Sequence, residues 1–280
     1  MQVFTDINGF RTKRIELPHQ ARIGLVPTMG ALHDGHASLV KRAVSENDFT
    51  IVSIFVNPTQ FSPTEDLNRY PRSLEADYQL LEKLGVDYVF SPLREEVYPK
   101  TAYFHFEING LADQLCGRSR PGHLNGVVQI VSILFHICQP SHAYFGLKDY
   151  QQCLILQHLV RELHFPLQVV PCPIVREIDG LAMSSRNVFL SDEERVQALF
   201  LHQSLRAIKK EIDAFTSVSE INDFVLQQLI HFPLVSLDYF EVLNGENLEQ
   251  VTDLTTTPHL HSFIAAYLGD TRLIDNMRLI

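Results

Sequence analysis

The sequence predicts an α/β fold, with an open parallel sheet carrying helices on both faces and a smaller C-terminal α+β domain. Through about Arg176, apolar strand-like runs alternate with amphipathic helical runs, which is the pattern of right-handed βαβ units. Ile51–Val56 is a near-continuous apolar run, as expected of a parallel strand covered on both faces. After Arg186 the alternation of strand-like and helical runs is replaced by two helical runs followed by short strand-like runs. We therefore expect domains at residues 1–180 and 181–280, with a boundary between about 176 and 190.

The elements of the first domain follow from their local patterns. Leucines recur at helical spacing between residues 73 and 84, and Gly85 ends that helix. The strands are expected at 23–26, 51–56, 87–90, 143–145 and 167–170. The helices are expected at 37–43, 73–84, 123–138 and 149–163.

The second domain opens with a capping box, in which Ser191 is the N-cap and Glu194 lies three residues later. The helix that it starts is expected to run to about Asp213. A second helix is expected at 219–231, followed by strands at 237–243, 262–268 and 272–275. Helices followed by short strands indicate a small α+β domain.

The charge balance restricts the class of partner. Asp and Glu outnumber Lys and Arg by 33 to 23, giving a net charge of -10. A general nucleic-acid binder needs a broad basic surface, so nucleic acid is not expected as a partner. Basic residues do gather locally at Arg118–His123 and at Arg176 with Arg186, which leaves an anionic small substrate open.

Three features favour a cytoplasmic protein without a membrane segment. The four cysteines (Cys116, Cys138, Cys153 and Cys172) are scattered and form no Cys-x-x-Cys motif, as is usual for reduced thiols. Residues 1–10 do not have the pattern of a signal peptide. The longest apolar stretch, 127–138, is interrupted by polar residues and falls short of the roughly 20 residues that a membrane span needs.

The segment Pro27–His36 is the most informative feature of the chain. It lies between a predicted strand and a predicted helix, so His33 and His36 fall side by side on the first helical turn. The backbone N–H groups and the positive dipole end of that turn suit a phosphate. Gly30 and Gly35 let the backbone come close to a bulky anion. We interpret the segment as a nucleotide triphosphate site.

The histidine pair also admits two other interpretations, as zinc ligands or as helix caps. Zinc takes a third and usually a fourth ligand, and none follows at the expected spacing. A zinc site is therefore disfavoured. Capping is compatible with a binding site but does not account for the two glycines.

Four further segments fit the same site, nearly all at strand ends. Asn57–Phe61 offers two amides, although alone it reads as a turn. Gly146–Asp149 offers a lysine for phosphate charge and a carboxylate for a helix cap or a ribose. Gln151-Gln152 follows one turn later, and Met183–Arg186 brings two hydroxyls and a guanidinium suited to phosphate oxygens.

Six motifs in order make the chain resemble the pantothenate synthetase (pantoate–β-alanine ligase) family. They are PTMGALHxGH, IFVNPxQF, Asn68–Arg72 (NRYPR), Arg120–His123 (RPGH), YFGxKD and Met183–Asn187 (MSSRN). The similarity covers about Ile23 to Leu190, and His-x-Gly-His and Met-Ser-Ser-Arg also resemble the signatures of the wider nucleotidyltransferase superfamily. The resemblance implies a Rossmann-like sheet domain, a homodimer, and ATP and Mg²⁺ as requirements.

The resemblance further implies a two-step reaction. The carboxylate of (R)-pantoate attacks the α-phosphate of ATP, giving pantoyl adenylate and pyrophosphate. The amine of β-alanine then attacks the adenylate and gives pantothenate and AMP. Charge accumulates on the phosphate, so positioned donors and cations matter more than a nucleophile on the protein.

The resemblance also assigns site residues. His33, His36 and Lys148 would be catalytic, with His36 also a proton donor. Lys148, Ser184, Ser185 and Arg186 would hold the triphosphate, and Gly146, Asp149 and the backbone at Val175 would hold adenosine. The remaining ATP-binding residues would be Met29, Gly30, Ala31, Leu32, Asp34, Gly35, Leu147 and Met183. Gln60 and Gln152 would bind pantoate, with Gln60 also near β-alanine and Asn57 in support.

Two departures from the family pattern stand out. Leu147 takes the place of a frequent glutamate, and we expect little effect because its side chain would point away from the site. The family often has adjacent acidic residues where this chain has Glu75-Ala76-Asp77. Mg²⁺ usually takes one or two carboxylates with phosphate oxygens and water, so Asp77 is a candidate ligand and the metal site is otherwise unassigned.

Three rival functions remain to be compared. Another adenylyltransferase of the superfamily would stop at the adenylated product, whereas a ligase releases AMP and an amide. A nucleotide-binding regulator is disfavoured because His33, His36, Lys148 and Arg186 are all present. A tRNA synthetase is disfavoured by the acidic charge and by the lack of an anticodon-binding domain.

Overall fold

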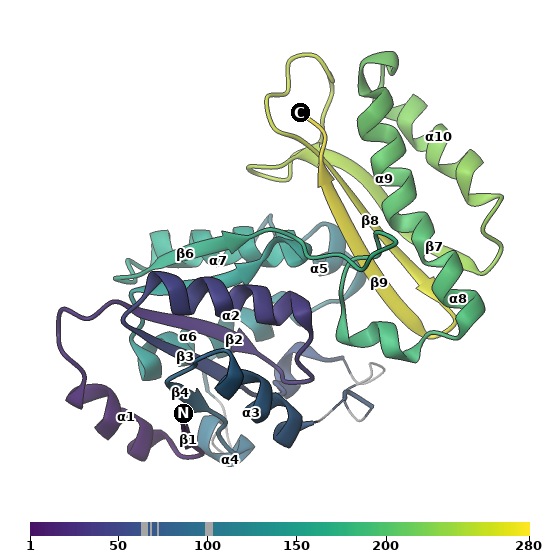
Figure 1. The fold of residues 1–280 in the computed structure, drawn as a ribbon. Coiled ribbons are helices and arrows are strands. Elements are labelled where there is room, and N and C mark those ends of the chain that lie inside the picture. Colours follow the sequence, from purple (N-terminus) through teal and green to yellow (C-terminus); the bar gives the residue numbers. More distant parts are fainter. Residues whose placement is uncertain (63–66, 68, 72, 99–102) are drawn as a thin grey trace. The chain divides into compact units, whose positions relative to one another are not determined.

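The computed structural model describes residues 1–62, 67, 69–71, 73–98 and 103–280, and it divides into two compact units (Figure 1). The N-terminal unit comprises Met1–Ala112, Arg120–Leu147 and Gln151–Pro173. The C-terminal unit comprises Asp113–Ser119, Lys148–Tyr150 and Ile174–Ile280. It thus begins before the sequence-based boundary at residue 180 and includes two short segments from earlier in the chain. Within the motif at 68–72, Asn68 and Arg72 lie outside the described residues.

The N-terminal unit contains every strand and helix that the sequence predicts for it. Its strands are β1 (Gln2–Phe4), β2 (Ile23–Thr28), β3 (Phe49–Ile54), β4 (Tyr88–Phe90), β5 (His142–Gly146) and β6 (Gln168–Cys172). Its helices are α1 (Ile7–Glu16), α2 (Asp34–Glu46), α3 (Leu74–Lys83), α4 (Arg94–Val97), α6 (His123–Cys138) and α7 (Tyr150–Glu162), the last beginning on a residue of the C-terminal unit.

Sequence reasoning missed the first strand and the first helix. β1 has three residues, two of them exposed, so it lacks an apolar run. α1 contains Gly9 and buries Phe10 alone, so it shows no apolar stripe. Its start is nevertheless marked, because the Asp6 side chain accepts a hydrogen bond from the Gly9 N–H at 2.7 Å.

All six strands of the larger sheet are parallel, in the order β1-β4-β3-β2-β5-β6. The chain builds outward from β2 through β3 and β4, and then returns to the other side of β2 with β5 and β6. The direction of winding therefore reverses between β2 and β5. In open parallel sheets a ligand binds at the carboxyl ends of the strands at such a reversal.

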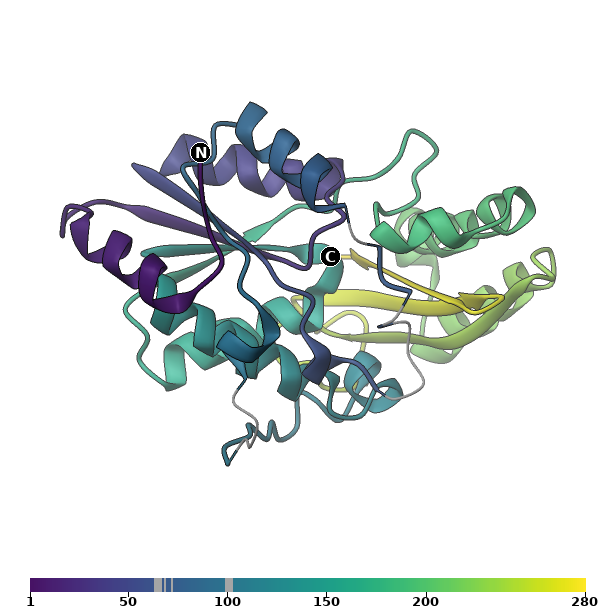
Figure 2. The ribbon, with the colours of Figure 1, turned by 90° about the horizontal axis from the view of Figure 1, so that it is seen from below.

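Helices cover both faces of this sheet, as predicted (Figure 2). Alternate strand residues face opposite sides, so Leu25 and Ile51 belong to one apolar core and Val26 and Val52 to the other. The first core is completed by α1, α6 and α7, and the second by α2 and α3. These two cores hold β2 rigidly at the centre of the sheet.

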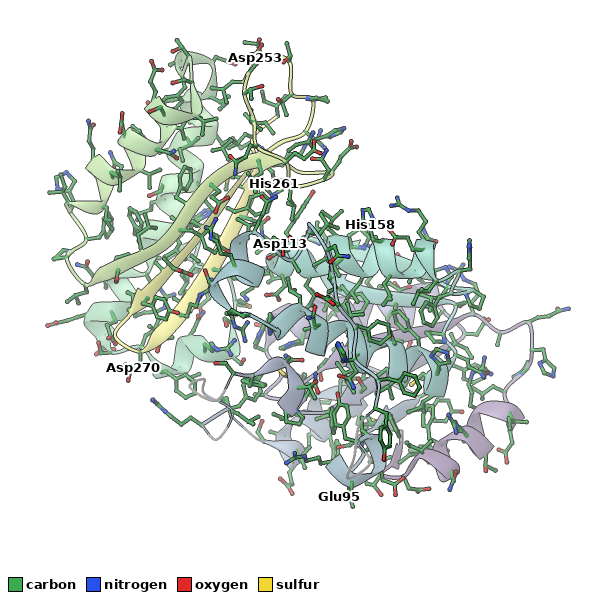
Figure 3. All side chains as sticks on the ribbon, turned by 180° about the vertical axis from the view of Figure 1, so that it is seen from behind. Glu95, Asp113, His158, Asp253, His261 and Asp270 are labelled. Atoms are coloured by element: carbon green, nitrogen blue, oxygen red, sulfur yellow. The ribbon has the colours of Figure 1, made fainter. Side chains whose placement is uncertain are left out.

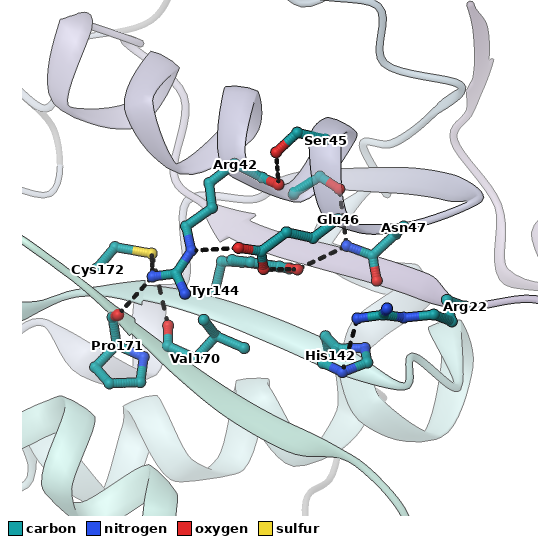
Figure 4. A network of polar contacts seen from close by, with 11 residues as sticks. Arg22, Arg42, Ser45, Glu46, Asn47, His142, Tyr144, Val170, Pro171 and Cys172 are labelled. Carbon is teal, nitrogen blue, oxygen red and sulfur yellow. Dashed lines mark hydrogen bonds and ion pairs between the residues drawn. The ribbon is translucent and has the colours of Figure 1, made fainter.

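A polar network ties the end of α2 to the sheet (Figure 4). Glu46 accepts hydrogen bonds from Arg42 Nε and from the Tyr144 hydroxyl, both at 2.9 Å, and Asn47 donates to the same hydroxyl at 2.7 Å. Burial raises the pKa of Tyr144 to about 12, so this phenol stays protonated and remains a donor. A Cβ on Gly24 would lie 2.6 Å from Asn47 Nδ2, so a larger residue here would displace the Asn47 side chain from its hydrogen bonds. The network fixes α2 from its carboxyl-terminal end.

The C-terminal unit is α+β, as predicted. Its antiparallel sheet has the order β7-β8-β9, and its core lies between that sheet and two helices. The elements are α5 (Leu115–Ser119), α8 (Asp192–Gln197), α9 (Leu199–Glu211), α10 (Val218–Leu229), β7 (Val235–Asn244), β8 (Leu260–Leu268) and β9 (Thr271–Arg278). Among the described residues, no helix of either unit is long and apolar enough to cross a membrane.

The capping box at Ser191 and Glu194 is confirmed, and the helix predicted after it is present as two helices instead of one. The helix is interrupted at Ala198, giving α8 and α9. α8 buries none of its residues, whereas α9 buries an apolar face that includes Phe200 and Leu205. The apolar face that packs in the core of the unit therefore belongs to α9 and not to α8.

Candidate active site

Both histidines of the Pro27–His36 segment cap α2 at the carboxyl end of β2. His33 is the N-cap, and its Nδ1 accepts the Gly35 N–H at 3.1 Å. His36 Nδ1 accepts the His33 N–H at 3.4 Å, and the two ring centroids are 4.1 Å apart. Because each Nδ1 is an acceptor, the proton of each neutral ring is on Nε2. The capping interpretation is confirmed, and capping gives each ring an Nε2–H donor in a fixed direction.

The turn that precedes this cap has left-handed backbone at two successive residues. Gly30 has φ 80° and Ala31 has φ 51°. The Gly30 N–H donates to Thr28 Oγ1 at 3.2 Å, while that hydroxyl donates to the Ser53 carbonyl of β3 at 2.7 Å. These two hydrogen bonds anchor the turn to the neighbouring strand. The positive φ at residue 30 explains why that residue is a glycine.

The candidate metal ligand Asp77 lies directly on this turn. Its Oδ2 accepts the Ala31 N–H and its Oδ1 accepts the Leu32 N–H, each at 2.9 Å. Ser73 Oγ donates to the same Oδ1 at 3.2 Å, and Asp77 is 2% exposed. Both carboxylate oxygens therefore serve the backbone, which does not fit a residue that presents an oxygen to Mg²⁺. The described residues contain no group of three or more side chains placed to hold a metal ion.

Gln60 ends a 3-10 turn, Pro58–Gln60, that follows β3. Its Nε2 lies 3.1 Å from Met29 Sδ, so Gln60 faces the segment that leads to the histidine cap. Asn57 Nδ2 donates to Gln60 Oε1 at 3.1 Å and to the Gly126 carbonyl of α6 at 3.0 Å. Asn57 Oδ1 accepts from the Tyr98 hydroxyl at 2.6 Å. Asn57 is 1% exposed, so its side chain holds Gln60 from the protein interior and is not accessible to solvent.

Two basic residues hold the backbone of Gln60. His123 Nδ1 donates to the Gln60 carbonyl at 2.8 Å, which leaves His123 Nε2 to accept from Arg120 Nη1 at 3.0 Å. The sequence marked this pair as part of a local concentration of positive charge and of the RPGH motif, without a role for either residue. Tyr98 and His123 are positioning residues that sequence reasoning missed, because their signal is a contact between distant segments.

At the end of β5, beside β2, the chain continues through Gly146 and Leu147. No heavy atom lies within 4 Å of a Cβ built on Gly146, so the space beside this residue is open. Of the two glutamines in α7, Gln151 is 5% exposed and donates to the Leu111 carbonyl at 2.7 Å. Gln152 is half-buried, so it is the better placed of the two to face a ligand.

Within the C-terminal unit, a hairpin brings Val175 and Met183 together. The Met183 N–H donates to the Val175 carbonyl at 3.0 Å, and Arg176 pairs with Ala182 across the hairpin. Ser184 then caps a 3-10 turn, Ser185–Phe189, by accepting the Arg186 N–H at 3.3 Å. Two segments that the sequence assigned to ATP are therefore neighbours in the structure.

Strand β9 connects this hairpin to Lys148. Asp275 accepts two hydrogen bonds from Arg176, at 2.6 and 3.0 Å, while Asn276 Nδ2 donates to the Lys148 carbonyl at 3.0 Å. Lys148 Nζ lies 3.4 Å from Asp149 Oδ1, and the Lys148 side chain is 22% exposed. Asp275 and Asn276, neither of which sequence reasoning identified, hold both candidate ATP segments of this unit.

His261 of β8, which is labelled in Figure 3, supports Asn276 from within the unit. Its Nε2 donates to Asn276 Oδ1 at 2.9 Å, and burial lowers its pKa to about 4. Tyr150 packs on the His261 ring at 4.3 Å between centroids and donates to the Gly245 carbonyl at 3.1 Å. The neutral imidazole thus fixes the amide that holds the Lys148 backbone.

Comparison with known proteins gives one consistent result. The family model described as Pantoate-beta-alanine ligase matches residues 2–278. Pantothenate synthetase of Fervidobacterium nodosum is 50% identical over 279 residues, covering 99% of both chains, and that of Pseudothermotoga lettingae is 48% identical over 277 residues, covering 99% of this chain and 98% of the relative.

Two solved structures agree with the sequence matches. The crystal structure of pantothenate synthetase from Thermus thermophilus has a TM-score of 0.94 at 42% identity, covering 100% of this chain and 99% of that one. The pantoate-beta-alanine ligase of Francisella tularensis, solved as a complex with beta-gamma ATP and beta-alanine, has a TM-score of 0.85 at 36% identity, covering 100% of this chain and 98% of that one.

Proposed function

The chain belongs to the pantoate–β-alanine ligase family and is a ligase, and from this premise we propose that it joins (R)-pantoate to β-alanine in two steps. ATP and pantoate first give pantoyl adenylate and pyrophosphate. β-Alanine then converts the adenylate to pantothenate and releases AMP. The Francisella relative, which was crystallised with a nucleotide and β-alanine, supports both small molecules as substrates.

The observation that carries this proposal is the pair of capping histidines at the carboxyl end of β2. This strand lies at the reversal of the sheet order, where open parallel sheets bind their ligands. The first turn of α2 offers backbone N–H groups and a positive dipole, and His33 and His36 add two Nε2–H donors. An anion with several oxygens, such as a triphosphate, matches this set of donors.

In the first step, a pantoate carboxylate oxygen bonds to the α-phosphorus and the bond to the β-phosphate bridge breaks. Negative charge grows on the phosphoryl oxygens as the two anions approach. We assign His33 and His36 to this charge, because donors that are already oriented stabilise it without reorganisation. Lys148, Ser184, Ser185 and Arg186 are assigned to the triphosphate, and Gly146, Asp149 and the backbone of Val175 to adenosine.

In the second step, the β-alanine nitrogen bonds to the acyl carbon, the bond to AMP breaks and the nitrogen loses a proton. Gln60 and Gln152 are assigned to pantoate, since paired amides hold a carboxylate and hydroxyls in one orientation. The support for Gln60 is its framework, in which Asn57 holds its side chain and His123 holds its backbone.

Three further parts of the proposal rest on the family. Mg²⁺ bound with ATP would neutralise phosphate charge, and no residue of this chain is assigned as its ligand. The protein acts in the cytoplasm, which agrees with four cysteines that form no disulfide. It acts as a homodimer, which light scattering on the purified protein measures directly.

The test is isotope exchange between pyrophosphate and ATP. With ATP and pantoate but no β-alanine, exchange is expected because the adenylate forms reversibly. Addition of β-alanine is then expected to yield AMP and pantothenate, identified by mass spectrometry. Exchange that strictly requires β-alanine would contradict the two-step order. An adenylated product that does not react with β-alanine would indicate another adenylyltransferase, and an absence of turnover would indicate a regulator.

A further inference from the structure

The turn between β2 and α2 has a backbone conformation that is unfavourable unless contacts from elsewhere stabilise it. Left-handed backbone disfavours any residue with a Cβ, and here Ala31 adopts it directly after Gly30. Such a turn points successive N–H groups to one side, where they form a concave site for an anion. A negative group placed there stabilises the turn, and without one the N–H groups repel each other.

Asp77 supplies that negative group from another element. It sits in the first turn of α3, and its two oxygens each accept one of the successive N–H groups of Ala31 and Leu32. Ser73 is the N-cap position of α3 but makes no cap hydrogen bond, and its hydroxyl points to Asp77 instead. The carboxylate is buried, so water does not compete for these bonds.

The fit between turn and carboxylate leaves no spare space. A Cβ on Gly30 would lie 3.0 Å from Asp77 Oδ2 and 3.1 Å from Ile54 Cγ2. Leu32 is followed directly by His33, whose ring and N–H both belong to the α2 cap. A shift at Ala31 and Leu32 therefore moves both histidines.

We propose that Asp77 is a positioning residue, which holds the Ala31–Leu32 turn and through it the His33–His36 cap, and that it is not a ligand of Mg²⁺. This inference rests on the proposed function, in which His33 and His36 of the cap bind the phosphate groups of ATP. A carboxylate that binds two backbone N–H groups would have to release them to serve a metal ion, and the turn would then lose its anchor.

The test compares Asp77→Asn with Glu75→Gln, which removes an exposed charge from the same helical turn. The asparagine keeps one acceptor oxygen and turns an NH2 group toward the other N–H. Asp77→Asn is expected to weaken ATP binding in calorimetry with EDTA present, and to lower the exchange rate about 100-fold at every Mg²⁺ concentration, as for a misplaced transition-state donor. Glu75→Gln is expected to match wild type in both.

A second substitution separates an anchor from a ligand. Ala31→Gly removes the Cβ that disfavours left-handed backbone, so in the Asp77→Asn background it is expected to recover about fivefold in exchange rate. In the wild-type background Asp77 already holds the turn, so the ratio of exchange rates with glycine and with alanine at position 31 is expected to be smaller there than in the Asp77→Asn background. If Asp77→Asn does not fold, Ser73→Ala removes one donor to the carboxylate, and we expect a smaller loss of the same kind.

The outcomes that overturn the proposal are distinct from those that overturn the function. A metal-ligand role predicts normal ATP binding in EDTA and an exchange rate restored by excess Mg²⁺. Wild-type values for Asp77→Asn at all Mg²⁺ concentrations would also refute positioning. If the wild-type protein itself fails to bind ATP or to exchange, the proposed function fails. The melting temperatures of the four combinations at Asp77 and Ala31 then still test the anchor.

Discussion

Gly126→Ala tests whether the position of Gln60 controls the use of pantoate. A Cβ on Gly126 would lie 2.3 Å from the Thr59 carbonyl oxygen and 2.7 Å from the Gln60 nitrogen. Ordinary contact begins near 3.4 Å, so α6 and the 58–60 turn must separate by about 1 Å. Both partners are backbone, and neither can rotate away. The displacement also strains the bond from Asn57 to the Gly126 carbonyl.

The magnitude follows from that displacement. A misplacement of about 1 Å in a positioning group costs on the order of 100-fold in rate, so kcat/KM for pantoate is expected to fall by about that factor. Overpacking costs about 1–3 kcal/mol of stability, while alanine recovers about 1 kcal/mol of helix propensity. The variant is therefore expected to stay folded with a modestly lower melting temperature.

The assay measures initial rates of AMP release against pantoate concentration, with ATP affinity measured by calorimetry in the absence of pantoate. The matched control is His136→Ala, an exposed position on the same helix about 15 Å along its axis. We expect ATP affinity to be unchanged in both variants. A Gly126→Ala enzyme with wild-type kcat and KM for pantoate would refute the argument that this contact places Gln60.

Three further predictions concern the histidine cap, the division of ligands and the pH dependence of stability. His36→Ala and His33→Ala are expected to slow adenylate formation about 100-fold or more and to cost about 1 kcal/mol of unfolding free energy as lost caps. Near-normal exchange would withdraw the catalytic assignment. Gln152→Ala is expected to weaken pantoate and spare ATP, while Lys148→Ala is expected to weaken ATP binding and to lose most of the adenylation rate. Equal losses of both ligands in both variants would mean that the pockets are wrongly divided. Burial lowers the pKa of His261 to about 4, so the folded protein holds this imidazole neutral while the unfolded chain protonates it below pH 6.5. The contribution of neutral His261 to the free energy of unfolding is therefore complete above pH 6.5 and is lost as the pH falls toward 4. Between pH 7.5 and pH 5.0, the free energy of unfolding measured in urea is expected to fall by about 2 kcal/mol more in the wild type than in His261→Gln. Equal decreases in the two proteins would show that His261 does not cause this pH dependence.

The predicted elements were found wherever the local pattern reflects burial. Short apolar runs indicated β2 to β6, and the inner strands β2 to β5 have such runs because a central parallel strand is covered on both faces. The alternation of strands and helices then predicted the open parallel sheet. Because the His33–His36 segment follows β2, it also predicted that the site lies at the carboxyl ends of the strands. β1 and α1 were missed because they bury too little to show a period.

The chain by itself determined which residue types carry the chemistry, since histidines at a helix start and a lysine after a strand are local features. Only the tertiary structure decided how they are held. Asp77 reaches the Ala31–Leu32 turn from 45 residues or more away, and Asn276 reaches the Lys148 carbonyl from 128 residues away. A hydrogen bond depends on distance and direction in space, and neither is encoded in the spacing of the two partners along the chain. The sequence could therefore suggest Asp77 for a metal, whereas the folded structure places both of its oxygens on the backbone.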